Sequence, residues 1–206
     1  MGARPDEPPI VELALPVCPA PPFYMRVVTW DIEIAQPIEE TPGGWEGARR
    51  GDAGISCVCL YDTTSGRTHV YDEHDLEECS AHLNSADMLV GFNTLSFDTP
   101  VMESVVGYSV LTPQYDILSL IWKELGTRHK GYRLADICER LQLGEKNGNG
   151  ESAPNLYRKG RFGRLFDYCI NDVHLTRKLA NWINDNGYIL TPEREPIPIP
   201  QLGAEA

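Results

Sequence analysis

The sequence predicts an α/β domain. An early β-meander pattern is followed by helical patterns that alternate with short apolar strands. The chain has 206 residues, of which 42% are hydrophobic, enough for one sizeable core. We expect this domain to span residues 23–188, between a Pro-rich N-terminal arm over residues 1–22 and a Pro-rich C-terminal tail over residues 189–206.

The first part of the domain is rich in strands. Alternating residues predict a strand over residues 24–34, and glycines and prolines then predict a loop over residues 35–54. The next two strands, residues 55–61 and 67–71, form a hairpin because the turn signal Thr63-Thr64-Ser65-Gly66 lies between them.

Helices and short strands alternate over the rest of the domain. Asp75 and Asp116 are suited to cap the N-termini of two of these helices. The expected elements are a helix over residues 75–83, a strand over 88–92, and helices over 99–106, 117–125, 134–141 and 163–186. The last helix is amphipathic, and residues 142–156 before it read as a loop.

Composition indicates a globular protein in a reducing environment. No apolar run approaches the roughly 20 residues of a membrane helix, and no signal-peptide pattern opens the chain. We therefore expect a cytoplasmic protein with no membrane partner. Six cysteines lack paired CxxC spacing, so a zinc site is not expected, and Cys57 and Cys59 read as buried thiols on one face of a strand.

Charge is distributed unevenly along this acidic chain. The formal net charge is −12, yet residues 123–164 hold ten Lys or Arg and five Asp or Glu, a local charge of +5. A basic patch of this kind can follow a phosphate backbone while the acidic remainder limits non-specific binding. A solvated helix and loop with scattered charge is the alternative.

Two carboxylates lie together on the first strand. Asp31 and Glu33 are two residues apart, so they share one face. The neighbouring residues are apolar, and carboxylates at the end of a buried strand are costly unless metals or other partners neutralise them. The alternative is a solvated strand end.

Two later segments carry similar groups. Asp98 precedes Pro100 and could simply cap the next helix, and Asn93 could satisfy turn backbone or position a substrate. Tyr168 and Asp172 are four residues apart on the long helix and share one face. Asp172 falls on the apolar stripe, where a carboxylate needs a partner such as a metal ion. A core tyrosine beside a solvated aspartate is the alternative.

Together these segments resemble the three motifs of the DEDD superfamily of 3′–5′ exonucleases. The matching residues are, motif by motif, Asp31 and Glu33 (D-x-E), Asn93, Phe97 and Asp98 (N-x3-F-D), and Tyr168 and Asp172 (Y-x3-D). The tyrosine marks the DEDDy subgroup, shared with the proofreading domains of family B DNA polymerases. The histidine subgroup has His at the position of Asp167. The resemblance covers roughly residues 24–185 and implies a ribonuclease-H-like exonuclease fold, a mixed central β-sheet flanked by α-helices.

The resemblance also implies an activity. The protein would be a 3′–5′ exonuclease that hydrolyses DNA from single-stranded or frayed 3′ ends and releases nucleoside 5′-monophosphates. Two divalent ions, Mg²⁺ or Mn²⁺, would be held by Asp31, Glu33, Asp98 and Asp172. Tyr168 would orient the attacking water. An RNase D-like 3′–5′ exoribonuclease and a catalytically quiet nucleic-acid-binding module are the alternatives.

Substrate contacts are expected beside the motifs and in the basic segment. The residues are Asn93, Phe97, Ile32, Trp30, Arg133 and Lys159. The partner would be single-stranded DNA, with RNA as the alternative, and the Pro-rich ends could recruit a replication or repair protein. Two departures from the family pattern, the long loop over residues 35–54 and the Gly/Asn-rich stretch over residues 144–154, could shape substrate access.

Overall fold

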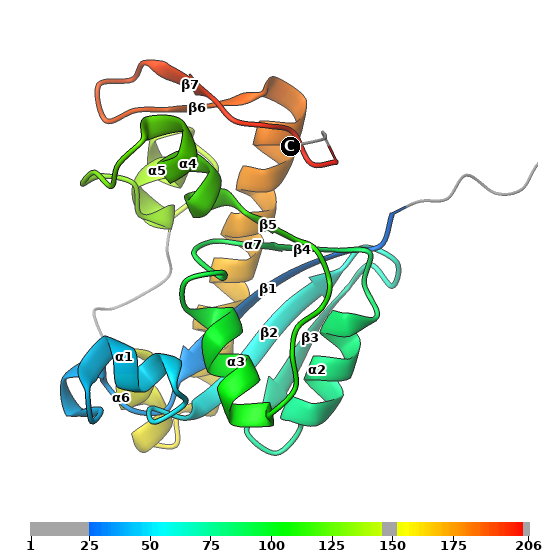
Figure 1. Cartoon of the computed structure of the whole chain (residues 1–206), viewed down its shortest axis with the longest axis vertical. Helices are drawn as coiled ribbons and strands as arrows, with labels where there is room; N and C mark the ends of the chain where they lie inside the picture. The colour runs from blue at the N-terminus through cyan, green and yellow to red at the C-terminus, as the bar shows by residue number, and fades with distance from the viewer. Residues whose placement is uncertain (1–24, 146–151, 204–206) are drawn as a thin grey trace, which may run out of the picture.

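A five-stranded mixed sheet forms the centre of the molecule. The computed structural model describes residues 25–145 and 152–203, so the predicted Pro-rich arm over residues 1–22 lies outside the described residues. The strands are β1 (Val27–Ile34), β2 (Ile55–Asp62), β3 (Arg67–Asp72), β4 (Met88–Gly91) and β5 (Gln114–Asp116). Their order is β3-β2-β1-β4-β5, with β1 antiparallel to β2 and parallel to β4 (Figure 1). The predicted α/β fold with a mixed sheet is confirmed.

Helices cover both faces of this sheet. The helices, in chain order, are η1 (Ile38–Glu40), α1 (Gly44–Arg49), α2 (Leu76–Asn84), α3 (Asp98–Val106), α4 (Ile117–Leu125), α5 (Leu134–Arg140), α6 (Ala153–Arg158) and α7 (Phe162–Asn186). The long helix α7 crosses one face, and α2 and α3 lie on the other (Figure 1). No helix among the described residues is both long enough and apolar enough to cross a membrane.

Alternation along β1 separates a core face from a polar face. Trp30 and Ile32 are buried in the cluster formed with α2 and α3. Asp31 and Glu33 point to the opposite face, toward α7, and are half-buried. Successive side chains of a strand point to opposite sides, so one strand supplies both core packing and the predicted carboxylate pair.

An ion-pair network joins the beginning of β1 to β2 and α2. The guanidinium of Arg26 donates to Asp62 Oδ2 at 2.7 Å, and Nε2 of His82 lies 3.2 Å from the same oxygen. Burial alone would raise the pKa of Asp62, but hydrogen bonds from Arg26, the Thr64 N–H and His82 lower it to about 2. This network fixes the position at which β1 enters the sheet.

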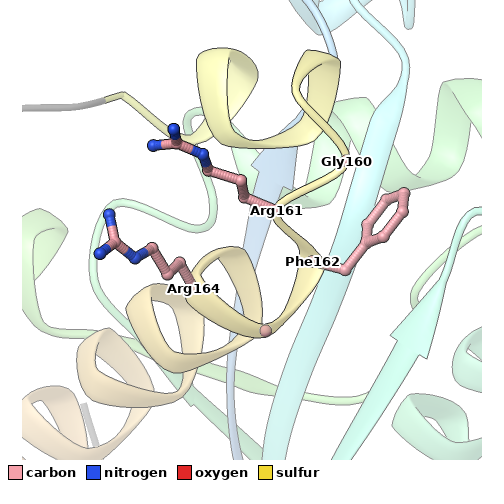
Figure 2. A pocket seen from close by; sticks show the side chains of 5 residues that line it. Gly160, Arg161, Phe162 and Arg164 are labelled. Carbon is pink, nitrogen blue, oxygen red and sulfur yellow. The ribbon is translucent and has the colours of Figure 1, made fainter.

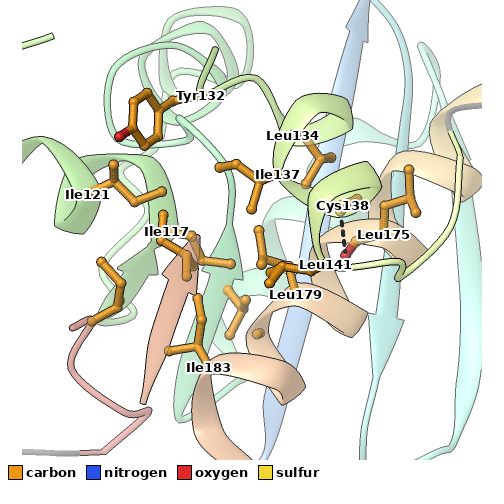
Figure 3. Packing of buried hydrophobic residues seen from close by; sticks show 14 of the residues in the cluster. Ile117, Ile121, Tyr132, Leu134, Ile137, Cys138, Leu141, Leu175, Leu179 and Ile183 are labelled. Carbon is orange, nitrogen blue, oxygen red and sulfur yellow. Dashed lines mark hydrogen bonds between the residues drawn. The ribbon is translucent and has the colours of Figure 1, made fainter. Parts of the chain in front are cut away.

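The segment after α7 packs against the core. Residues 188–190 and 196–198 form β6 (Tyr188–Leu190) and β7 (Pro196–Pro198), which pair antiparallel. Ile189, Ile197 and Ile199 are buried in the same cluster as α4, α5 and α7, whose residues Figure 3 shows packing together. The boundary expected at residue 188 therefore falls within a continuous core, because isoleucines between the prolines supply buried side chains.

Two segments expected as loops contain helices. Residues 35–54 include η1 and α1, and residues 142–156 include the start of α6. In α1, Gly47 lies so close to the Pro42 carbonyl that a Cβ there would be 1.7 Å from its oxygen. Gly47 therefore permits the tight packing of a helix inside the segment that was expected to be a loop. Residues 146–151 of the Gly/Asn-rich stretch lie outside the described residues.

A candidate active-site cavity

A cavity of about 860 Å³ opens beside the central strand. Its walls come from β1, α1, α4, α5 and α7 and from the segments over residues 92–98 and 128–133. All five residues predicted to carry catalysis line it: Asp31, Glu33, Asp98, Tyr168 and Asp172. The structure therefore brings together side chains from three segments that are far apart in the sequence.

Asp31 and Glu33 form a close carboxylate pair. Their ligand oxygens and the sulfur of Cys169 all lie within 4.8 Å of one another. The Cys169 thiol donates to the Asp31 carbonyl at 3.5 Å and lies 3.8 Å from Asp31 Oδ2. This places the pair between the sheet and α7, with one side facing the cavity.

Asp98 is joined to the central strand. Helix α3 begins at Asp98 itself, and Oδ1 accepts a hydrogen bond from the backbone N–H of Ile32 at 3.1 Å. Burial, together with the neighbouring carboxylates of Asp116 and Asp172, raises the pKa of Asp98 to about 7 against the opposing effect of the Ile32 N–H. The alternative role as a simple helix cap is not what the structure shows.

Asp116 holds the loop that carries the second motif. Its Oδ1 accepts from the N–H groups of Asn93 at 2.8 Å and Leu118 at 3.1 Å. Its Oδ2 accepts from the Leu95 N–H at 3.0 Å and the Ser119 hydroxyl at 2.9 Å. The predicted helix cap is confirmed. Because the same carboxylate binds the preceding loop, Asp116 also positions Asn93, which lines the cavity in a left-handed conformation.

Tyr168 and Asp172 lie one helical turn apart on α7 and face the cavity together. Asp172 is only 5% exposed and sits between buried Cys169 and Val173. Tyr168 is half-buried. The helix therefore presents a buried carboxylate and a phenol to the same space as the carboxylates of β1.

The donor set fits divalent cations. Five carboxylates border one cavity. Four of them are the predicted metal ligands, of which Asp98 and Asp172 are buried, and the fifth is Asp136 on α5. Carboxylates that crowd into a space of low dielectric repel one another, and a bound cation would offset that repulsion. Oxygen ligands of this kind select hard ions such as Mg²⁺ and Mn²⁺.

The segment over residues 128–133 adds basic residues to the cavity lining. Arg128, His129, Lys130 and Arg133 all line it, so Arg133 lies where a substrate contact was expected. These side chains are exposed and come from the segment between α4 and α5. The cavity lining thus combines carboxylates with cations.

The rest of the basic segment lies elsewhere. Lys159 is exposed at the end of α6 and is outside the cavity lining, so its expected contact with the substrate stays a prediction. Arg161, Phe162 and Arg164 border a separate hollow of about 490 Å³. Figure 2 shows the two arginines on one side of this turn and Phe162 on the other.

Of the substrate contacts expected beside the motifs, all but one lie at the cavity. Ile32, Asn93 and Phe97 line the cavity, but Trp30 is fully buried on the other face of β1. The prediction of Trp30 as a substrate contact is therefore wrong. Alternation contained the signal, since Trp30 is adjacent to Asp31 and must face away from it.

Trp45 is the aromatic residue that sequence reasoning missed. It lies on α1, is 58% exposed and lines the cavity. Its ring meets that of Phe97 edge-on, with centroids 5.5 Å apart and an angle of 74°. The sequence signal that could have identified it is a tryptophan in the unusually long segment after the first motif.

A mixed sheet whose central strand carries carboxylates beside a cavity defines a ribonuclease-H-like α/β protein. The sequence model described as the RNase_H superfamily matches residues 46–184, and the chain belongs to that superfamily. Nucleases of this superfamily generally use divalent metals and act on nucleic acids. These features agree with the predicted DEDD exonuclease-like domain.

One solved structure with a similar fold is the family B DNA polymerase from the hyperthermophilic archaeon Pyrobaculum calidifontis. The TM-score is 0.61 at 16% sequence identity, and the match covers 78% of this chain and 24% of the polymerase chain. This likeness shows the fold, and this chain spans about a quarter of the polymerase's length. A search of the curated proteins found no match.

Proposed function

We propose that this protein is a metal-dependent 3′–5′ exonuclease of the tyrosine DEDD subgroup that acts on DNA. The observation that carries the proposal is the convergence of Asp31, Glu33, Asp98, Tyr168 and Asp172 on one cavity. Membership of the RNase H superfamily supports a nuclease. The basic residues over 128–133 in the cavity lining support a polyanionic substrate.

In this proposal the carboxylates hold two divalent ions, Mg²⁺ or Mn²⁺. Bound ions would supply Lewis-acid stabilisation of the charge that develops on the phosphate. The phenol of Tyr168 orients the water that adds to phosphorus. The bond to the 3′ oxygen of the preceding nucleotide then breaks, and a nucleoside 5′-monophosphate leaves.

The basic and the aromatic residues of the cavity lining would hold different parts of the substrate. Arg128, Lys130 and Arg133 contact phosphates upstream of the terminal nucleotide. Trp45 and Phe97, already in edge-to-face contact, offer a surface for the terminal base. Stacking on aromatic rings tolerates any base and requires an unpaired one, which favours single-stranded or frayed ends. A cytoplasmic setting and a replication or repair partner remain predictions from the sequence.

The test uses 5′-labelled single-stranded DNA and RNA with Mg²⁺, Mn²⁺ or EDTA. We expect a ladder that shortens from the 3′ end of DNA, is abolished by EDTA, and is at least 1,000-fold slower in Asp31→Asn and Asp172→Asn, on the order expected for groups that act in the chemical step. Asp185→Asn, an exposed aspartate on the same helix as Asp172, is the matched control and should retain activity.

Each other outcome has a definite meaning. Faster degradation of RNA than of DNA would assign the enzyme to the RNase D-like alternative. Binding without cleavage would indicate a catalytically quiet module. Cleavage that persists in EDTA, or in both active-site variants, would contradict the proposed mechanism.

A further inference from the structure

Three buried thiols meet directly behind the carboxylate pair. Cys57 and Cys59 lie on the same face of β2, and Cys169 comes from α7. Their sulfur atoms all lie within 4.8 Å of one another, and each residue is fully buried. None of these thiols has a part in the proposed nuclease chemistry, so their convergence needs a separate account.

The thiols and the carboxylates are cross-strand neighbours. Asp31 pairs with Cys59 and Glu33 with Cys57 in the register of β1 and β2. Cys169 links the two groups, because its sulfur lies 3.8 Å from Asp31 Oδ2. The Asp31 carboxylate therefore lies next to the thiol cluster through Cys169, and an ion held by the three sulfurs would draw it in as a fourth ligand.

We propose that Cys57, Cys59 and Cys169, with Asp31 as the fourth ligand, bind one thiophilic divalent ion such as Zn²⁺ or Cd²⁺. Zinc–sulfur bonds of about 2.3 Å in tetrahedral geometry place sulfurs about 3.8 Å apart, so the cluster needs to contract by about 1 Å at most. Binding releases the three thiol protons to solvent and forms three metal–sulfur bonds.

The ligand chemistry separates this site from the carboxylate site. Thiolates select soft or borderline ions, whereas Mg²⁺ and Mn²⁺ prefer carboxylate oxygens. In this proposal the ion enters from the cavity, since Asp31 and Glu33 both line it and both lie within 4.8 Å of Cys169 Sγ.

Occupation of the thiol site has two consequences. It joins β2 to α7, so it stabilises the folded state by an amount that grows with the logarithm of the free-ion concentration above the Kd. It also draws Asp31 toward the sulfurs and away from the cavity. A thiophilic ion therefore inhibits the nuclease, a consequence that rests on the proposed function.

The experiment titrates the reduced full chain with Cd²⁺ alone and follows the ultraviolet charge-transfer absorption of cadmium–thiolate bonds. We expect saturation at one equivalent and a rise in Tm. Cys59→Val, which keeps a strand-forming residue of similar volume, and Cys169→Ala should both lose the absorption. Cys79→Ala, a fully buried cysteine of α2 in a different cluster, is the matched control and should keep it.

Circular dichroism establishes whether each variant is folded. Because two different cysteines are replaced, the test still holds if one of the two variants fails to fold. Absence of the absorption at one equivalent in the native protein overturns the proposal, as does its full retention in folded Cys59→Val or Cys169→Ala. Because the readout needs no nucleic acid, it is independent of nuclease activity. A protein that degrades DNA but shows no thiolate absorption keeps the proposed function and loses this site.

Discussion

Replacing Asp116 by asparagine tests how the second-motif loop is held. The carboxylate accepts from two loop amides, Asn93 and Leu95, and from the first turn of α4. Asparagine keeps one acceptor oxygen, and its NH₂ group must face either the Asn93 N–H or the Leu95 N–H. One partly buried amide then loses its acceptor, at about 1–3 kcal/mol. The remaining bonds lose their charge assistance, so we expect a total loss of about 3–4 kcal/mol.

The assay is urea denaturation at pH 7, followed by tryptophan fluorescence. Asp75→Asn is the matched control, since Asp75 also stands at a helix N-cap but is exposed and makes no side-chain capping hydrogen bond within the described residues. That variant should change the free energy of unfolding by less than about 0.5 kcal/mol. Equal losses for the two variants would refute the role assigned to Asp116 in holding the loop.

Three further predictions concern the ion-pair network and the cavity. The pKa of Asp62 falls from an ordinary 3.8 to about 2. Its charge therefore contributes about 2 kcal/mol that is fully present above about pH 5 and is lost as the pH falls through 2. Urea denaturation of native protein and Asp62→Asn across this range should show their difference vanish at low pH, and a constant difference would contradict the assignment. Trp45→Ala should raise the KM for single-stranded DNA about 5- to 100-fold with kcat nearly unchanged, because a stacked base is lost; an unchanged KM in steady-state kinetics would exclude the stacking role. Tyr168→Phe should lower kcat about 10- to 100-fold without weakening DNA binding in a fluorescence anisotropy assay. A variant whose kcat equals that of the native protein would show that the hydroxyl has no part in orienting water.

Local patterns in the sequence were enough for most of the elements. Period-two alternation predicted β1 and the shared face of Asp31 and Glu33, and the turn signal predicted the β2–β3 hairpin. Helical periodicity predicted α7 within one residue of its observed start. These features depend on residues a few positions apart, whose relative directions follow from backbone geometry alone.

Patterns were less informative where glycine and proline carry packing roles. Gly47 lies in a segment predicted to be a loop, although it permits the close approach of α1 to Pro42. Ile197 and Ile199 lie in the predicted Pro-rich tail, although they complete the core against α7. Composition describes a segment by its average, whereas burial is decided by single side chains.

Residue spacing within one element predicts which side chains share a face: Asp31 with Glu33, Cys57 with Cys59, and Tyr168 with Asp172. Which of these faces meet follows from the packing of the elements in three dimensions. It brought Cys169 against the thiols of β2 and placed Trp45 beside Phe97 at the cavity. Periodicity fixes direction within one element, but contact between elements depends on how their surfaces pack, and this information is spread over the whole chain.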